Sequence, residues 1–348
     1  MFVIGIDPHK STHTATAVDP DTNRDLGSIR IRSSFDDYAQ LWTWATQWPD
    51  RIWAVENASG LGHHLTQWLI GRGEAVVDIP PTATARVREL SRGGRRKNDR
   101  IDAAAAACVA FSHGDFRPVA PEDHTDVLRI LDERRIDLVK QNGRLINQLH
   151  AIMRELLPGG IECNLDTEHA ATELKRFRPG TASDAMRKKV GLEIVGDLRR
   201  LRFQIDDLTD RIKTELTACG TRLQKIPGVG VVTAARILAR TGNPTRFANE
   251  GAYANYTGTA PVEIASADKQ RHRLSRGGDR TLNSAIHIVA VTQARTTTSA
   301  GHAYHRRKVA EGKTHREATL CLKRQIVKTL WRTMQDDFVR RVEEPITA

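Results

Sequence analysis

The stretch GGRRKNDRID occupies residues 93–102 and runs directly into five alanines at residues 103–107. A basic, glycine-containing loop thus leads into two aspartates and then into residues of high helix propensity. If the helix begins at Asn98, a favoured N-cap residue, Asp99 and Asp102 lie about one turn apart on the same face. Two adjacent carboxylates repel each other, which favours a divalent cation between them. The alternative is a solvent-exposed helix start whose acids interact with the helix dipole.

The chain before this helix alternates short apolar runs with amphipathic segments separated by turn signals. The predicted order is three strands, helix, strand, helix, strand and helix. The strands are expected at residues 2–6, 12–18, 26–31, 51–55 and 75–79, and the helices at residues 36–48, 61–70 and from residue 98 onward. Pro80 and Pro81 are expected to end the last strand, with the basic loop following directly.

Two further acids stand at strand ends in this order, since Asp7 follows the first strand and Glu56 the fourth. The order of elements and the positions of the acids resemble the α/β RNase H-like nuclease fold, and within it the Holliday-junction resolvases of the RuvC type. In that fold the first and fourth strands are neighbours, so the resemblance implies that both acids converge with the two helix carboxylates. Four carboxylates suit one or two Mg²⁺ ions, which prefer oxygen ligands and would clamp a scissile phosphate. For each strand-end acid alone, the alternative is an ordinary surface position.

The chain of 348 residues carries 53 lysines and arginines against 42 acids, a formal net charge of +11 with a pI near 9.8. This excess favours a nucleic-acid partner, because phosphate neutralisation supplies most non-specific affinity. The cysteines are widely separated, which argues against a disulfide framework or a zinc module and fits a reducing cytoplasm; they are Cys108, Cys163, Cys219 and Cys321. No apolar run approaches the roughly 20 residues of a membrane span, and the apolar N-terminus meets Asp7 too early for a signal peptide. The sequence therefore predicts a soluble intracellular protein with no membrane partner.

A heptad pattern follows at residues 123–157 and again at residues 194–212. In the first tract most core positions are leucine or isoleucine, and Arg135 and Asn142 are the exceptions. The pattern predicts long helices with an apolar seam, and hence a coiled-coil arm that serves assembly rather than chemistry. The two helices could pair within one chain or with another subunit, and the periodicity does not decide between these arrangements.

The last third of the chain is expected to be mostly helical, with a glycine turn, IPGVG, at residues 226–230. Such a turn before a helix resembles the helix-hairpin-helix element, in which the backbone N–H groups of Gly228 and Gly230 would face a DNA phosphate. The alternative is a simple tight turn. A dense basic segment follows at residues 269–280, and the final helices are basic again.

Taken together, five short motifs look like those of the DEDD transposases of the insertion-sequence family numbered one hundred and ten, the bridge-RNA-guided recombinases. The motifs are GID at residues 5–7, VEN at 55–57, NDRID at 98–102, IPGVG at 226–230, and the segment 259–280. The resemblance covers residues 1–335. It implies a RuvC-like DEDD domain at residues 1–120, an α-helical coiled-coil arm at 121–220, a mostly α-helical C-terminal transposase domain at 221–335, and a tail at 336–348.

The resemblance also implies the site residues. Carried over by position, the catalytic and metal-binding acids are Asp7, Glu56, Asp99 and Asp102, and the nucleophile is Ser266. Family members often have glycine after this serine, whereas Ala267 and Asp268 follow here, so Ser275 is kept as the alternative. The residues expected to contact nucleic acid are Arg95, Arg96, Lys97, Arg100, Gly228, Gly230, Lys269, Arg271, Arg273 and Arg276.

The function implied by the resemblance is DNA recombination in the bacterial cytoplasm, at the nucleoid, by which the protein excises and inserts its own mobile element. It would use Mg²⁺, donor and target DNA and a structured bridge RNA, and it would act as a homo-oligomer, either a dimer or a tetramer. Two alternatives stay open. One is a two-metal nuclease that cuts branched DNA by hydrolysis without a covalent intermediate, and the other is a non-catalytic nucleic-acid-binding assembly protein.

Overall fold

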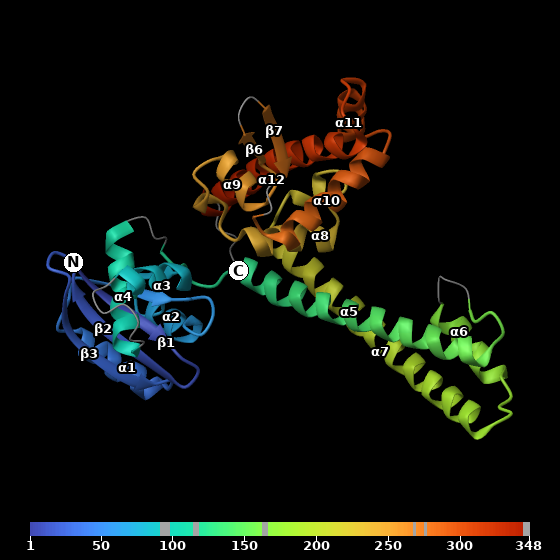
Figure 1. Ribbon diagram of the computed structural model, residues 1–348, viewed down its shortest axis with the longest axis horizontal. Helices are drawn as coiled ribbons and strands as arrows, with labels where there is room; N and C mark the ends of the chain where they lie inside the picture. The colour runs from blue at the N-terminus through green and yellow to red at the C-terminus, as the bar shows by residue number, and fades with distance from the viewer. Residues whose placement is uncertain (91–97, 114–117, 162–165, 267–268, 275–276, 344–348) are drawn as a thin grey trace. The chain divides into compact units, whose positions relative to one another are not determined.

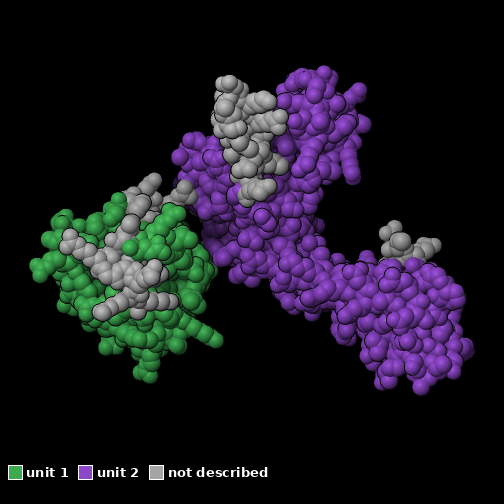
Figure 2. Space-filling model, in the orientation of Figure 1, with its two compact units in different colours: residues 1–122 green, residues 123–348 purple. Residues whose placement is uncertain are grey.

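The computed structural model describes residues 1–90, 98–113, 118–161, 166–266, 269–274 and 277–343. The chain forms two compact units, residues 1–122 and residues 123–348, which Figure 2 shows in separate colours. The first unit is an α/β domain, and the second is almost entirely helical. Within the described residues, no helix combines the length and the hydropathy that crossing a lipid bilayer requires.

The first unit is built on a five-stranded sheet with the order β3-β2-β1-β4-β5 (Figure 1). Its strands are β1 (Phe2–Pro8), β2 (Thr12–Asp19), β3 (Arg24–Arg32), β4 (Arg51–Glu56) and β5 (Val76–Ile79). β1 lies in the centre, antiparallel to β2 and parallel to β4. The first and fourth strands are therefore neighbours, and the predicted RNase H-like fold of this unit is confirmed.

Helices cover both faces of this sheet. They are α1 (Phe35–Ala45), α2 (His63–Ile70), α3 (Pro81–Leu90) and α4 (Asp99–His113). Side chains alternate along a strand, so Ile4 and Ile6 join the core under α1 and α2, whereas Val3 joins the core under α3 and α4. By the same alternation, Gly5 and Asp7 lie on the α4 side of the sheet.

Helix α3 corrects one prediction from the sequence. A loop was expected directly after Pro80 and Pro81, but a ten-residue helix begins at Pro81. Proline is favoured at the first position of a helix, because its missing N–H has no partner there in any case. Ala83 and Val87 of this helix pack against the core that it shares with α4.

Gly5 allows α4 to lie directly against β1. A Cβ atom at this position would stand 1.8 Å from the carbonyl oxygen of Ala103 and 2.8 Å from the backbone nitrogen of Ala107. Both alanines are fully buried, so the alanine run supplies the matching small surface on the helix. This close packing brings the first turn of α4 next to the end of β1.

Gly5→Ala is expected to destabilise the first unit by about 3 kcal/mol or more, because the added methyl group forces β1 and α4 apart. Five of the six tryptophans lie in residues 1–122, so urea unfolding followed by tryptophan fluorescence reports on this unit. Gly71→Ala is the matched control, since a Cβ there has no neighbour closer than 3.4 Å, and its effect should stay within about 0.5 kcal/mol. Equal unfolding midpoints for the two variants would contradict the close packing.

The second unit contains a long helical arm made of α5 (His124–Leu156), α6 (Thr167–Arg176) and α7 (Ala182–Ala218). Helices α5 and α7 pack antiparallel along their length (Figure 1). Leu128 shares a core with Ile212 at the root, and Leu138 packs with Leu201 farther along. At the tip, α6 closes a third cluster that contains Leu149. Of the two arrangements that the heptad pattern left open, the structure shows pairing within the chain.

The remaining elements form the C-terminal part of the second unit. They are the 3-10 turns Leu223–Lys225 and Pro244–Arg246, the helices α8 (Val231–Thr241), α9 (Glu250–Tyr256), α10 (Arg280–Arg295), α11 (Ala300–Ala310) and α12 (His315–Glu343), and the strands β6 (Pro261–Ser266) and β7 (Lys269–Leu274).

A single core joins Leu128 and Ile212 of the arm to Ile237 of α8. Arg236 of α8 also donates two hydrogen bonds, of 2.9 and 2.8 Å, to the buried carboxylate of Asp132 in α5. Removal of either side chain would leave the charge of the other one buried without a partner, so this ion pair holds α5 of the arm against α8.

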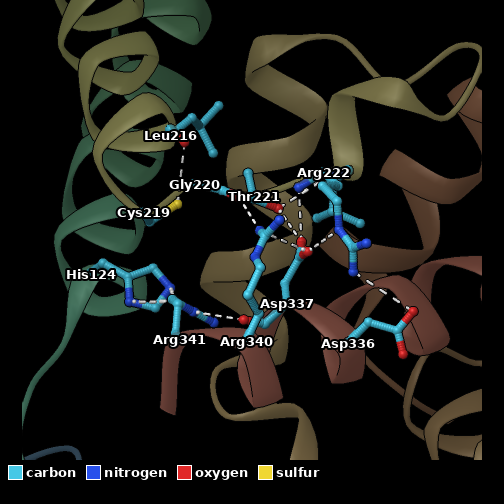
Figure 3. Close-up of polar contacts among 11 residues, drawn as sticks. His124, Leu216, Cys219, Gly220, Thr221, Arg222, Asp336, Asp337, Arg340 and Arg341 are labelled. Carbon is cyan, nitrogen blue, oxygen red and sulfur yellow. Dashed lines mark hydrogen bonds and ion pairs between the residues drawn. The ribbon is translucent and has the colours of Figure 1, made fainter. Parts of the chain in front are cut away.

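A second buried carboxylate holds the end of the chain (Figure 3). Asp337 of α12 accepts hydrogen bonds from the backbone N–H and Nε of Arg222, at 2.8 and 2.6 Å, and from Thr221 Oγ1 at 3.1 Å. Arg341 of the same helix contacts the ring of His124 at the start of α5. The sequence predicts a tail from residue 336, whereas α12 continues to Glu343, because these contacts hold its last turns against the arm.

Candidate functional site

Two acids lie at the carboxyl ends of neighbouring parallel strands. Asp7 stands near the end of β1 and Glu56 ends β4, and the register pairs Ile6 with Val55 just before them. Because the two strands are parallel, both acids lie at the same edge of the sheet.

The first turn of α4 carries two more acids. Asn98 Oδ1 accepts a hydrogen bond from the backbone N–H of Arg100 at 2.9 Å, and Asp99 and Asp102 lie within the first turn. Thr16 of β2 donates to the carbonyl oxygen of Arg100 at 3.2 Å, which ties this turn to the sheet. Asp102 is buried, whereas Asp99 is partly exposed.

The pKa of Asp7 depends on its burial and on the charges of its neighbours. Asp7 is 8% exposed, and burial raises the pKa of its carboxyl group from 3.8 to about 6. The positive charge of His9 opposes this shift, whereas the negative charges of Glu56, Asp102 and Asp99 add to it. The structure thus brings the other three acids, from β4 and α4, within electrostatic range of Asp7.

His9 belongs to the same cluster and was not predicted from the sequence. Asp7, His9 and Asp99 each offer one potential ligand atom, and these atoms lie within 4.8 Å of one another. His9 Nδ1 stands 3.7 Å from Asp7 Oδ2, and neither buried atom has a hydrogen-bond partner among the described residues. The signal in the sequence is the spacing: a histidine follows the strand-end acid by two residues, and alternate residues of an extended chain face the same side.

Neighbouring polar groups hold two of the acids. Thr84 Oγ1 of α3 donates a hydrogen bond to Glu56 Oε1 at 2.9 Å. Arg30 of β3 forms an ion pair with Asp99, with a nitrogen–oxygen distance of 3.3 Å. Neither partner was predicted, since α3 itself was missed and Arg30 stands 69 positions before its acid in the sequence.

This set of donors fits a divalent metal ion. A buried carboxylate oxygen that has no hydrogen-bond partner and lies within electrostatic range of three other acids is costly to keep ionised. A divalent cation would offset that cost, because it binds ionised carboxylates and neutralises their mutual repulsion. Carboxylate oxygens are also the ligands that Mg²⁺ and Mn²⁺ take in proteins.

Asp7→Asn is expected to stabilise the metal-free protein by about 2–3 kcal/mol at pH 8, and by only about 1 kcal/mol at pH 4.5. The pKa of Asp7 is higher in the folded protein, about 6, than its ordinary value of 3.8. The wild type therefore loses stability as the pH rises from about 3.8 to about 6, and the neutral amide removes this loss. Urea unfolding in the presence of a chelator measures the difference, with Asp36→Asn on α1 as the control. An equal gain at both pH values would contradict the buried charge.

The basic residues predicted to contact nucleic acid at the start of α4 are only partly described. Arg95, Arg96 and Lys97 lie outside the described residues, so their role stays a prediction. Arg100 is described, and its Nε donates to Asp25 Oδ2 of β3 at 2.7 Å. Its guanidinium group therefore fastens α4 to β3, and more than half of the side chain still faces solvent.

The predicted nucleophile lies in the second unit, on a β-hairpin that the sequence did not predict. β6 and β7 pair antiparallel, and the last pair before the turn joins Ser266 to Lys269. Ser266 therefore ends β6, and Arg271 and Arg273 follow at alternate positions of β7. The alternative nucleophile Ser275 and the basic residue Arg276 lie outside the described residues.

The base of this hairpin is fixed by close backbone contacts. Gly258 before β6 and Gly278 after β7 both have positive φ angles, and a Cβ on Gly278 would stand 2.6 Å from the backbone nitrogen of Gly258. Asn283 of α10 donates hydrogen bonds to the carbonyl oxygens of Thr257 and Gly258, at 2.7 and 3.2 Å. Lys323 of α12 donates in turn to Asn283 Oδ1 at 2.6 Å. Helices α10 and α12 therefore hold the two ends of the hairpin together.

The glycine turn at residues 226–230 packs on α10. Gly228 has a φ of 82°, and a Cβ there would stand 3.2 Å from the carbonyl oxygen of Val289. Gln293 of α10 donates a hydrogen bond to the carbonyl oxygen of Pro227 at 2.7 Å. Gly230 is the exposed N-cap of α8, and a Cβ there would meet no atom within 4 Å. One side of the turn is thus occupied by α10, and a phosphate contact at Gly228 and Gly230 stays a prediction.

Two family models match the chain. The DEDD model for IS110, described as "Transposase", matches residues 4–158, and the model described as "Transposase IS116/IS110/IS902 family" matches residues 220–306. The "Insertion element IS110 uncharacterized 43.6 kDa protein" of Streptomyces coelicolor is 36% identical, over 96% of this chain and 94% of its own length. The "Insertion element IS116 uncharacterized 44.8 kDa protein" of Streptomyces clavuligerus is 27% identical, over 99% of this chain and 97% of its own length. Among solved structures, the Thermus thermophilus RuvC structure matches 34% of this chain and 100% of its own, at 18% identity and a TM-score of 0.28.

Proposed function

Because the chain belongs to the IS116/IS110/IS902 family of transposases, we propose that it is a recombinase that excises and inserts an insertion sequence under the guidance of a bridge RNA. The observation that carries the proposal is the cluster of acids around the buried Asp7, at the edge of an RNase H-like sheet. The protein acts in the bacterial cytoplasm, at the nucleoid, on donor and target DNA.

The acid cluster is the proposed metal site. Asp7, Glu56, Asp99 and Asp102 are its proposed ligands, and Mg²⁺ is the proposed ion. When bound, the ion supplies charge stabilisation for the phosphate that is being cut. Thr84 and Arg30 orient Glu56 and Asp99, and the burial of Asp7 excludes water from one side of the site.

Ser266 is the proposed nucleophile. Its Oγ attacks a DNA phosphorus atom and loses its proton, the bond from phosphorus to the leaving DNA oxygen breaks, and that oxygen takes up a proton. The product is a phosphoserine linkage to one strand and a free DNA hydroxyl on the other, so the bond energy is kept for rejoining to a new partner. Lys269, Arg271 and Arg273 of β7 are proposed to stabilise the additional negative charge.

The distribution of charge supports the assignment of roles to the parts of the chain. Residues 221–348 carry 22 lysines and arginines against 10 acids, whereas residues 1–122 carry 14 against 15 and residues 123–220 carry 17 against 17. The basic excess thus lies in the C-terminal part, where DNA and the guide RNA are proposed to bind. The arm is proposed to serve assembly into a dimer or tetramer, and light scattering on the RNA–protein complex measures that state.

The test of the proposed function is a covalent trap. A recombinase of this kind forms a protein–DNA adduct that survives denaturant, whereas a two-metal nuclease releases cleaved DNA with no adduct. Chelation of divalent ions should abolish cleavage in both cases and leave a non-catalytic binding protein unaffected. Sequencing the RNA that purifies with the protein tests the guidance, and the absence of an RNA from the same element would remove that part of the proposal.

A further inference from the structure

We propose that His9 is a direct ligand of the metal ion held by Asp7 and Asp99, and that it shifts the preference of the site from Mg²⁺ toward Mn²⁺. The inference rests on the proposed metal site and adds a ligand and an ion preference to it. It arises from two buried polar atoms that face each other without hydrogen-bond partners.

The position of His9 is fixed by the turn between β1 and β2. Its backbone N–H donates to the carbonyl oxygen of Thr12 at 2.8 Å, directly after the end of β1. The side chain is about half exposed, yet its Nδ1 atom is buried and has no hydrogen-bond partner among the described residues. Asp7 Oδ2, which lies 3.7 Å from this atom, is also buried and has no hydrogen-bond partner among the described residues.

The distance of 3.7 Å between these atoms is too long for a direct hydrogen bond and close to the separation of two ligands on one ion. A charge-assisted hydrogen bond between imidazole and carboxylate would be about 2.7–2.9 Å long. Two ligands bound to one ion at about 2.1 Å, with an angle of about 90–120° between them, stand about 3.0–3.6 Å apart. Asp7, His9 and Asp99 each offer one ligand atom, and these atoms lie within 4.8 Å of one another. These three residues are therefore the proposed ligands of one ion.

The chemistry of the donors sets the preference. Mg²⁺ is a hard ion that takes oxygen ligands and keeps several waters. An imidazole nitrogen adds a favourable bond for first-row transition ions, whose affinities for nitrogen sites exceed that of Mg²⁺. A site with one nitrogen among carboxylates therefore binds Mn²⁺ more tightly than a site built from oxygen alone.

The experiment uses the full chain with Mn²⁺ as the probe. Electron paramagnetic resonance counts the free ion during a titration, and Mg²⁺ affinity follows from competition. His9→Asn is the informative variant, because Asn Oδ1 occupies about the position of Nδ1 and replaces nitrogen by oxygen. We expect Mn²⁺ affinity to fall about 10-fold or more, and Mg²⁺ affinity to change by less than about threefold. His9→Ala, which offers no ligand, should weaken both ions.

A spectroscopic signature identifies the ligand without any assay of activity. Electron spin echo modulation of the bound Mn²⁺ should show coupling to ¹⁴N in the wild type and lose it in both His9 variants. His63→Asn is the matched control, because His63 lies in the same unit and pairs with Glu122 instead. Its ¹⁴N signal and its Mn²⁺ affinity should equal those of the wild type.

The outcomes separate this inference from the proposed function. If Asp7→Asn abolishes Mn²⁺ binding but the His9 variants keep both the ¹⁴N signal and the affinity, His9 is no ligand and the metal site stands. If Asp7→Asn binds Mn²⁺ as tightly as the wild type, the metal site itself is wrong. Thermal unfolding of each variant without metal verifies that it is folded, and the half-exposed side chain of His9 makes both substitutions compatible with the fold.

Discussion

Asp102→Asn is expected to reduce DNA cleavage by about 10³-fold or more, while the affinities for RNA and DNA change by less than about twofold. Asparagine keeps the shape of the side chain but removes the charge that a metal ion requires. Asp102 is buried and lies within electrostatic range of Asp7. Single-turnover cleavage of a supercoiled donor plasmid measures the rate, and filter binding measures the affinities.

The control for this variant is Asp36→Asn, which removes an exposed acid from the first turn of α1 in the same unit. It should cleave at the wild-type rate. Asp102→Asn should also unfold at a temperature no lower than that of the wild type, which shows that the loss is chemical rather than structural. Cleavage by Asp102→Asn at more than a tenth of the wild-type rate would remove Asp102 from the site.

Ser266→Ala is expected to eliminate the covalent protein–DNA adduct and strand exchange, with RNA and DNA affinities within about twofold of the wild type. One hydroxyl group contributes little to binding, but without its oxygen no phosphoserine bond can form. Denaturing gel electrophoresis of labelled DNA after the reaction measures the adduct. Ser275→Ala is the matched control, nine residues later, and it should form the adduct normally. The reverse pattern would move the nucleophile to Ser275.

The two inactive variants together test how the site is assembled. The proposed metal-binding acids belong to residues 1–122 and the proposed nucleophile Ser266 to residues 123–348, so the proposed reaction needs groups from both units. Mixing Ser266→Ala with Asp102→Asn should restore cleavage if one subunit supplies the serine and another the acids. No recovery in the mixture would favour a site built within one chain.

The parts of the fold that could be predicted are those in which apolar residues form a clear local pattern, either a continuous run or a heptad repeat. The apolar runs before Asp7 and Glu56 mark buried strands, and the parallel pairing of β1 and β4 then places both acids at one edge. The heptads predicted α5 and α7, but their apolar seam is the same whether the partner helix belongs to the chain or to another subunit. Pairing within the chain depends on the segment between α5 and α7, and the sequence of that segment has no heptad pattern.

The elements that were missed had weak or misleading local signals. Pro81 resembles a stop after a strand, although proline is equally suited to the first position of α3. β7 is almost wholly polar, so it shows no alternation of apolar and polar residues. His9 was not predicted because carboxylates alone account for a magnesium site, and only the structure places its Nδ1 atom 3.7 Å from Asp7 Oδ2.

Helix α5 is continuous from His124 to Leu156, so a small rotation at one end of the arm moves the other end by a larger distance. Leu128 lies in the core shared with α8 and Leu156 in the cluster at the far end, and the helix between them spans about 42 Å at about 1.5 Å per residue. A tilt of about 10° at the root therefore moves the far end by about 7 Å. The buried pair of Asp132 and Arg236 restrains that tilt at its pivot. The position of the far end relative to α8 therefore depends on this one ion pair and the core around it.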